Sequence, residues 1–150
     1  MIEYTVKVHA DGTKFWYLND QRHREDGPAI ECASGTKYWY LNDQLHREAG
    51  PAVEYADGGK YWYLNGQLHR EDGPAFECAS GTKYWYRNDQ LHREAGPAVE
   101  YADGGKYWYL NGEELTEAEF NARMNPSRKV AELTVAEISK LLGYEVKVVR

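Results

Sequence analysis

The chain has 150 residues and a formal net charge of −6 at pH 7, and its 13 tyrosines and 5 tryptophans exclude a disordered composition. The acidic balance argues against a surface that grips nucleic-acid phosphates. No stretch approaches the roughly 20 apolar residues of a membrane-spanning helix, and the segment from Met1 to Lys7 lacks a secretory signal, so we predict a cytoplasmic protein.

A 23-residue repeat organises most of the chain. The tryptophans lie at positions 16, 39, 62, 85 and 108, and Gly-Pro-Ala triplets begin at 27, 50, 73 and 96. A fixed period of this length is typical of repeat proteins, in which each unit packs mainly on its neighbours. The segments 32–66 and 78–112 differ only where Leu41 is replaced by Arg87. We predict a mainly β fold, a single-layer antiparallel β-hairpin solenoid over residues 1–112, with a small helix–helix–strand cap over residues 113–150.

One repeat contains two short strands and two turns. Residues 52–55 and 60–64 are rich in β-forming side chains and predict strands, joined by a turn at 56–59. Asn65-Gly66 then predicts a tight type I′ turn, and the other repeats place Asn-Asp or Asn-Gly there. Gly73-Pro74 ends the unit, because proline has no N–H to donate to a ladder.

The register of this hairpin decides which side chains share a face. If the loop counts as two or four residues, Glu54 lies opposite Tyr61 and Val53 lies opposite Trp62, and opposed residues point to the same side. We therefore predict a packing face of tryptophans with apolar partners, and a recognition face that carries tyrosines and one glutamate in each repeat. The predicted partner-binding residues are Tyr38, Tyr40, Glu54, Tyr61, Tyr63, Glu77, Tyr84 and Tyr86.

The N-terminal segment conflicts with this register. Ile2, Tyr4, Val6 and Val8 alternate with polar residues and predict a strand, yet the same counting places them on the tyrosine side. Either a bulge shifts this strand, or the tyrosine face is partly covered at the N-terminal end.

Beyond Gly112 the repeat stops, and the pattern predicts helices. Thr116-Glu-Ala-Glu119 is typical of a capping box, with Leu115 and Phe120 placed as a hydrophobic staple. Asn125-Pro126-Ser127 is expected to separate this helix from the next one.

A second capping box at residues 134–137 predicts a helix through Leu142 that Gly143 closes. Residues 144–149 alternate as in a strand. We expect this tail to cap the open end of the solenoid, as terminal units of repeat proteins do.

The unit Lys60-Tyr-Trp-Tyr-Leu-Asn-Gly-Gln-Leu-His, with its Gly-Pro-Ala and Tyr-Ala-Asp-Gly-Gly segments, resembles MORN-type repeats and their bacterial relatives, the YwqK-family antitoxins. The resemblance covers about residues 4–112. The strand reads Tyr-Trp-Tyr-Leu where MORN repeats carry Tyr-x-Gly-x-Trp, and this variant is similar to repeats in proteins of large bacteriophages and giant viruses. The resemblance implies a single-layer sheet solenoid that is used for binding and has no shared catalytic residues.

The repeated His-Arg-Glu motif, at 23–25, 46–48, 69–71 and 92–94, is the main candidate for chemistry, because a histidine beside a carboxylate can act as a general base. Equivalent histidines recur every ~10 Å by strand spacing, which is too far for a shared zinc ion. We interpret the motif mainly as hydrogen bonds and ion pairs between repeats. We predict a non-enzyme without cofactor or metal, since no nucleotide-binding or hydrolase motif is present.

Binding of single-stranded nucleic acid is an alternative use for sheet aromatics. Residues 1–112 hold 17 acidic and 12 basic side chains, so the basic groove that such binding needs is missing. We therefore expect nucleic acid not to be the partner.

We predict instead a non-catalytic protein-binding module, because tyrosine-rich surfaces suit protein recognition. The resemblance points to a phage-encoded inhibitor of a host enzyme or defence system, or to an antitoxin that neutralises a cognate toxin. A peripheral scaffold for lipid head groups is a third alternative, which an acidic chain without basic clusters disfavours. A homo-oligomer formed through the open sheet edges is a further expectation.

Overall fold

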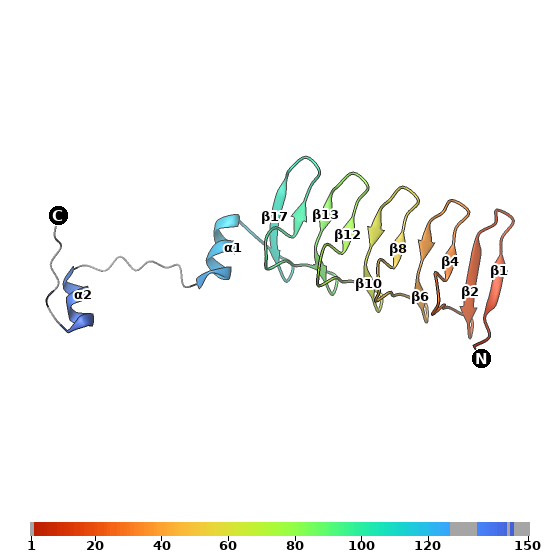
Figure 1. Cartoon of the computed structure of the whole chain (residues 1–150), viewed down its shortest axis with the longest axis horizontal. Coiled ribbons are helices and arrows are strands. Elements are labelled where there is room, and N and C mark those ends of the chain that lie inside the picture. The colour runs from red at the N-terminus through yellow and green to blue at the C-terminus, as the bar shows by residue number, and fades with distance from the viewer. Residues whose placement is uncertain (1, 127–134, 144, 146–150) are drawn as a thin grey trace. The chain divides into compact units, whose positions relative to one another are not determined.

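Paired hairpins follow one another along the part of the chain that is coloured red to cyan in Figure 1. This computed structural model describes residues 2–126, 135–143 and 145. Contacts divide the chain into two units, residues 1–120 and 121–150. The helices are α1 (Glu117–Met124) and α2 (Val135–Leu142).

Each repeat of the first unit has an upper hairpin and a lower hairpin, named for their positions at the top and bottom of the sheet in Figure 1. The upper strands are β1 (Thr5–Val8), β2 (Lys14–Leu18), β4 (Ile30–Glu31), β5 (Lys37–Tyr38), β8 (Val53–Glu54), β9 (Lys60–Tyr61), β12 (Phe76–Glu77), β13 (Lys83–Tyr84), β16 (Val99–Glu100) and β17 (Lys106–Leu110). The lower strands are β3 (Gln21–Arg22), β6 (Tyr40–Leu41), β7 (Gln44–Leu45), β10 (Tyr63–Leu64), β11 (Gln67–Leu68), β14 (Tyr86–Arg87), β15 (Gln90–Leu91) and β18 (Glu113–Leu115).

The upper hairpins form one antiparallel sheet of 12 strands, which also includes β3 and β18. Within this sheet β5 pairs with β4 of its own hairpin and with β8 of the next repeat. The sheet therefore grows by one hairpin per repeat. The predicted mainly β architecture of antiparallel hairpins with a period of about 23 residues is confirmed.

The lower hairpins are closed by type I′ turns. Two successive turn residues have positive φ, as in Asn42 (50°) and Asp43 (62°), which is the geometry that matches the twist of the flanking strands. Asn65 and Gly66 have φ values of 50° and 78°. The predicted turn is confirmed, and Asn-Asp forms it as Asn-Gly does.

The upper turn contains three residues. The Tyr55 N–H donates to the Gly59 carbonyl at 2.8 Å, which leaves 56–58 as the loop. Gly58 ends the loop with a φ of 97°, a conformation that L-residues with a side chain rarely adopt. A loop of this kind is a common hairpin connection, with a glycine in the bulge position.

This odd loop shifts the hairpin register by one residue from the prediction. Glu54 lies opposite Lys60, and Val53 lies opposite Tyr61. The predicted pairing of Glu54 with Tyr61 and of Val53 with Trp62 was wrong, because a shift of one residue moves every side chain of a strand to the other face.

The same shift resolves the conflict at β1. Val6 lies opposite Trp16, and Val8 lies opposite Lys14, so both valines belong to the tryptophan side of the sheet. The position of these valines requires neither a bulge in the first strand nor a covered tyrosine face, the two alternatives that the sequence left open. Both remain exposed on the edge strand, at 46% and 63% of their surface.

Histidines join each repeat to the next lower turn. The Asn42 N–H donates to His23 Nδ1 at 3.1 Å, and the Asn65 N–H donates to His46 Nδ1 at 3.1 Å. The equivalent bonds to His69 and His92 come from Asn88 at 3.3 Å and Asn111 at 3.0 Å. The predicted role of the His-Arg-Glu motif between repeats is confirmed.

The buried core is thin, because a single sheet layer has little interior. Its main members are alanines without exposed surface and β-branched residues of the upper strands: Ala29, Ala52, Ala75, Ala98, Ile30, Val53 and Val99.

The sheet extends beyond the predicted end of the repeats at residue 112. β18 pairs with β17, and Leu115 lies opposite Trp108. The Thr116 N–H donates to Glu119 Oε2 at 2.8 Å, and the Glu119 N–H donates to Thr116 Oγ1 at 3.2 Å, which is the predicted capping box at the start of α1. Leu115 and Phe120 are both buried.

In the second unit, α2 ends as predicted. Gly143 has a φ of 73°, and its N–H donates to the Ser139 carbonyl at 3.0 Å, which closes the last turn. Thr134 of the second capping box and most of the strand predicted at 144–149 lie outside the described residues.

Candidate functional site on the tyrosine face

The register gives the sheet two chemically different faces. The Trp face carries Trp39 together with Lys37 and Glu54, which lie opposite each other. The Tyr face carries Tyr38, which lies opposite Val53. The two faces keep this character in every repeat.

On the Trp face, an arginine lies over each of four tryptophans. The Arg47 guanidinium carbon is 3.9 Å from the ring centroid of Trp39, a cation–π contact. Arg47 Nη1 also donates to Glu54 Oε1 at 2.8 Å and to the Pro51 carbonyl at 3.0 Å. The same contact joins Arg24 to Trp16, Arg70 to Trp62 and Arg93 to Trp85, at 4.2, 4.0 and 3.8 Å.

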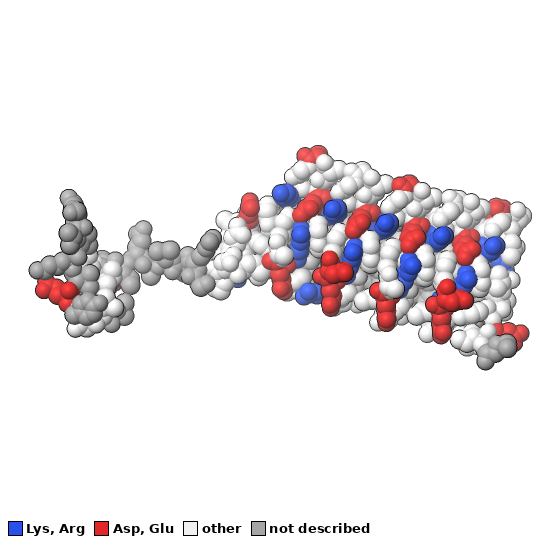
Figure 2. All heavy atoms as spheres, viewed as in Figure 1, with Lys and Arg blue, Asp and Glu red and all other residues white. Residues whose placement is uncertain are grey.

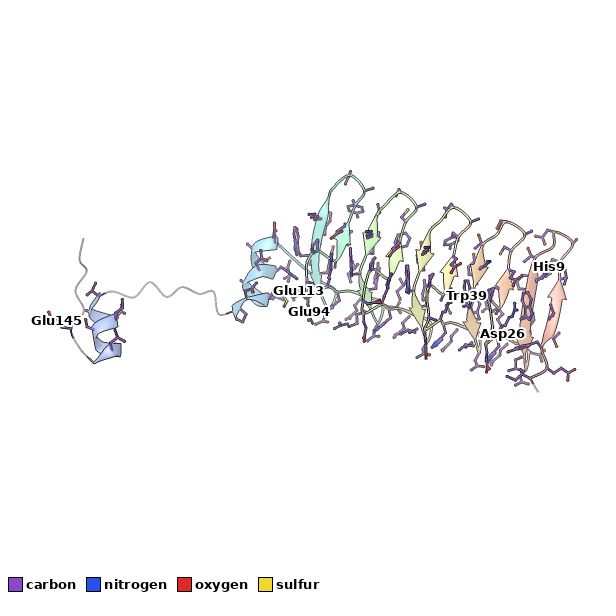
Figure 3. All side chains as sticks on the ribbon, viewed as in Figure 1. His9, Asp26, Trp39, Glu94, Glu113 and Glu145 are labelled. Carbon is purple, nitrogen blue, oxygen red and sulfur yellow. The ribbon has the colours of Figure 1, made fainter. Side chains whose placement is uncertain are left out.

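The same arginines form hydrogen bonds with two of the predicted partner-binding residues. Glu54 and Glu77 lie on the Trp face, where they accept hydrogen bonds from Arg47 and Arg70. Their predicted position beside the tyrosines was therefore wrong. Figure 2 shows this face, with stripes of basic and acidic side chains that recur along the sheet, and Figure 3 labels Trp39 of the second repeat.

On the Tyr face, the upper side chains form a continuous row of ring contacts. Tyr61 and Phe76 stack with centroids 4.3 Å apart, and Phe76 and Tyr84 stack at 5.3 Å. Tyr55 meets Tyr61 edge to face at 5.6 Å. The row continues through Tyr101, which is 6.0 Å from Tyr84. Contacts of this kind add about 0.5–1.5 kcal/mol each beyond the area that they bury.

A second row of tyrosines runs along the lower hairpins. Tyr63 lies opposite Leu68 across its turn, and its ring centroid is 6.4 Å from that of Tyr61. The other repeats place Tyr40 opposite Leu45 and Tyr86 opposite Leu91. The two rows together form an aromatic surface, on which Arg22 lies over the Tyr40 ring at 4.1 Å.

Burial changes the ionisation of these phenols. Desolvation is the main cause that raises the pKa of Tyr38, Tyr61, Tyr63 and Tyr86 above the ordinary value. Burial and the neighbouring Tyr101 raise the pKa of Tyr84 to about 12. These five phenols are therefore neutral at physiological pH, and each keeps its hydroxyl proton.

The structure places all six predicted tyrosines on one face, where Tyr38, Tyr61 and Tyr84 belong to the upper row and the other three to the lower row. It adds residues that the prediction left out, chiefly Tyr55 and Tyr101, each 41% exposed. The sequence signal for these two was their recurrence two repeats apart, at a position where the alternate repeats carry cysteine.

Within residues 2–126, 135–143 and 145, no three His, Cys, Asp or Glu side chains are placed to hold a metal ion. Cys32 and Cys78 are free thiols. What the Tyr face offers chemically is apolar contact area with hydroxyl groups at fixed spacing.

Comparison with protein-family models finds no match to the chain, and comparison with curated proteins finds no significant relative. The resemblance to MORN-type repeats therefore stays a prediction. No helix among the described residues is long and apolar enough to cross a membrane.

Proposed function

We propose that this chain is a non-catalytic protein-binding repeat module, and that its Tyr face is the surface that contacts the partner. The observation that carries the proposal is the continuous aromatic row from Tyr38 to Tyr107, which keeps large apolar side chains partly exposed along several repeats. Contiguous apolar surface of this kind is typical of interaction sites.

The composition of the face supports a protein partner. Tyrosine and phenylalanine are enriched at protein interfaces, and charged residues are depleted at their centres. The charged residues of the upper strands from β2 to β17, such as Lys60 and Glu54, lie on the opposite face, whereas Lys7 of β1 lies opposite Phe15 on the Tyr face. Tyrosine also gives large contact area with few rotatable bonds, so ordering it on binding costs little entropy.

The ring geometry disfavours base stacking as the mode of binding. Stacking of nucleic-acid bases needs ring faces that are open to the ligand. The faces of Tyr61, Phe76 and Tyr84 pack against one another. Ring edges and hydroxyl groups are left for contact, which suits a protein surface.

The Trp face supports binding over catalysis. The histidine and arginine of the His-Arg-Glu motif, which was the main candidate for chemistry, bond to side chains and backbone of their own or the adjacent repeat. These contacts support a structural role for the motif.

A photo-crosslinking amino acid at Tyr55 tests the proposal in bacterial cells. Benzoylphenylalanine at this position keeps an aromatic ring on the Tyr face, and the same group at Lys60 on the Trp face is the matched control. We expect a discrete crosslinked protein from position 55 and none of that mass from position 60. Crosslinking from position 60 alone would reverse the assignment of the faces.

A further inference from the structure

Three pockets with equivalent linings recur on the Trp face, one repeat apart. They lie around Trp39, Trp62 and Trp85, between the Arg-Glu-containing loops of successive repeats, with volumes of about 730, 550 and 500 Å³. Neighbouring pockets share a loop, since Arg47-Glu48-Ala49 lines the first two. The pockets therefore form a row along the sheet.

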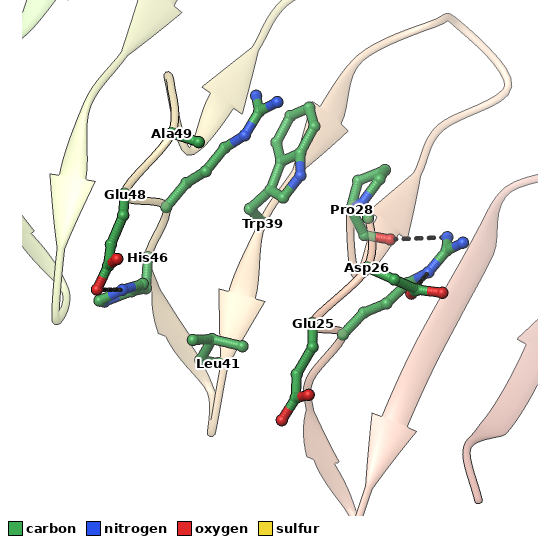
Figure 4. A pocket seen from close by; sticks show the side chains of 11 residues that line it. Glu25, Asp26, Pro28, Trp39, Leu41, His46, Glu48 and Ala49 are labelled. Atoms are coloured by element: carbon green, nitrogen blue, oxygen red, sulfur yellow. Dashed lines mark hydrogen bonds and ion pairs between the residues drawn. The ribbon is translucent and has the colours of Figure 1, made fainter. Parts of the chain in front are cut away.

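The first pocket has an apolar floor and an acidic rim. Trp39 and Leu41 lie between Glu25, Asp26 and Pro28 on one side and His46, Glu48 and Ala49 on the other (Figure 4). The rim carboxylates face solvent, and the side chain of Glu48 is 87% exposed. The arginines of the lining are already paired, Arg24 with Glu31 and with Asp26 of the rim, and Arg47 with Glu54.

The third pocket holds a cation that the chain itself supplies. The floor residue is Leu41 in the first pocket, Leu64 in the second and Arg87 in the third. Arg87 Nη1 lies 3.9 Å from Glu94 Oε1 on the rim. One pocket of the row thus carries a guanidinium beside a rim carboxylate in its own lining.

We propose that the pockets at Trp39 and Trp62 bind basic side chains from an extended segment of a partner protein. This surface is separate from the Tyr face, and the inference does not depend on the function proposed for that face. Charge complementarity selects the occupant, because the exposed rim carboxylates of Glu25, Glu48 and Glu71 lie beside histidines and form no ion pair with an arginine in the described part of the chain. The apolar floor accommodates the aliphatic stem of an arginine or lysine.

The spacing of the pockets specifies the spacing of the basic residues. Two strands per repeat at ~4.8 Å place equivalent points ~10 Å apart. Three residues of a polyproline II segment span about 9.3 Å. A partner segment with an arginine at every third position therefore brings one guanidinium to each pocket.

The probe for this site is a synthetic peptide with three arginines at every third position, separated by alanine and proline. A peptide of equal composition with the arginines adjacent is the control. The matched protein variants are Leu64→Arg and Arg87→Leu, since equivalent repeats hold both residues at this position and each variant is expected to fold. Titration calorimetry at physiological salt measures the affinities.

We expect Leu64→Arg to weaken binding of the spaced peptide about tenfold and Arg87→Leu to strengthen it about tenfold, because each changes one charge-assisted contact. A double variant on the Tyr face, Tyr55→Ser with Tyr101→Ser, is expected to bind the peptide like the parent chain. The proposal is overturned if neither pocket variant changes the affinity, if the clustered peptide binds equally well, if the Tyr-face variant abolishes binding, or if the parent chain binds no peptide at millimolar concentration.

Discussion

At the scale of single residues, each repeat depends on an arginine that has several partners at once. Arg70 lies over Trp62 at 4.0 Å and donates to Glu77 Oε1 and to the Pro74 carbonyl, both at 3.1 Å. Gly73 allows this approach, because a Cβ atom there would lie 2.8 Å from Arg70 Cζ. The glycine of the Gly-Pro-Ala triplet is thus explained by the arginine that passes over it.

Gly73→Ala is expected to destabilise the protein by about 1–2 kcal/mol, because the added methyl group displaces Arg70 from Trp62. Chemical denaturation measures the loss. Asp72→Ala is the matched control, since the equivalent residues Ala49 and Ala95 are alanine already, and it is expected to change stability by less than ~0.5 kcal/mol. An unchanged stability in Gly73→Ala would contradict the account of this contact.

At the scale of elements, the sequence is sufficient where structure depends on neighbouring residues. The type I′ turn at Asn65-Gly66 and the capping box at Thr116 follow from local chemistry, and both are as predicted. The prediction placed Val53 with the tryptophans and Glu54 with the tyrosines, which was wrong. The register of the hairpin depends on whether Gly59 belongs to the loop. The adjacent Gly58-Gly59 pair left that question open, and an odd loop exchanged Val53 and Glu54 between faces.

Apart from the first upper turn, in which His9 occurs with Thr13, the upper turns are of two kinds that differ in the residue before the loop. Cys32 occurs with Thr36, whereas Tyr55 occurs with Gly59. A Cβ atom on Gly59 would lie 3.5 Å from Tyr55 Cδ2 and 3.3 Å from Asp57 Oδ1, so a threonine side chain has little room there. In the other kind of turn, Thr36 Oγ1 accepts a hydrogen bond from the N–H of the next repeat's turn at 3.2 Å.

Gly59→Thr alone is expected to cost about 1–2 kcal/mol of stability through this crowding. Adding Tyr55→Cys removes the ring, and the double variant is expected to recover at least ~0.5 kcal/mol relative to additivity. A double-mutant cycle by thermal or urea unfolding measures the coupling. Strict additivity of the two changes would show that the ring does not exclude threonine.

At the scale of the whole molecule, the two faces of the sheet make different kinds of contact. The Trp face holds repeats together through arginine contacts, and the histidines add bonds between successive lower hairpins. The Tyr face keeps an aromatic row that several repeats contribute to. Stability in such an array is approximately a sum over repeats and their interfaces, so changes on the Tyr face need not unfold the sheet.

The raised pKa values of the buried tyrosines predict how the free energy of unfolding changes at alkaline pH. Burial raises the pKa of Tyr38, Tyr61 and Tyr84, the last to about 12, above the ordinary value of 10.0. Folding therefore favours the neutral phenol, so this contribution is complete below about pH 10 and is lost as the pH rises toward 12. Urea unfolding at increasing pH, with tyrosinate absorbance as a second signal, is expected to show this decline. Constant stability through this range would contradict the burial of the phenols.

The most direct test of the central claim is the affinity of the crosslinked partner for two matched variants. Tyr55→Ser with Tyr101→Ser removes exposed rings from the Tyr face at positions where other repeats hold cysteine, so the fold is expected to persist. We predict that this variant loses about tenfold or more in affinity, while Lys60→Gln on the Trp face, outside the pockets, binds within about twofold of the parent chain. The opposite pattern, with binding lost in Lys60→Gln and kept in the tyrosine variant, would contradict the assignment of recognition to the Tyr face.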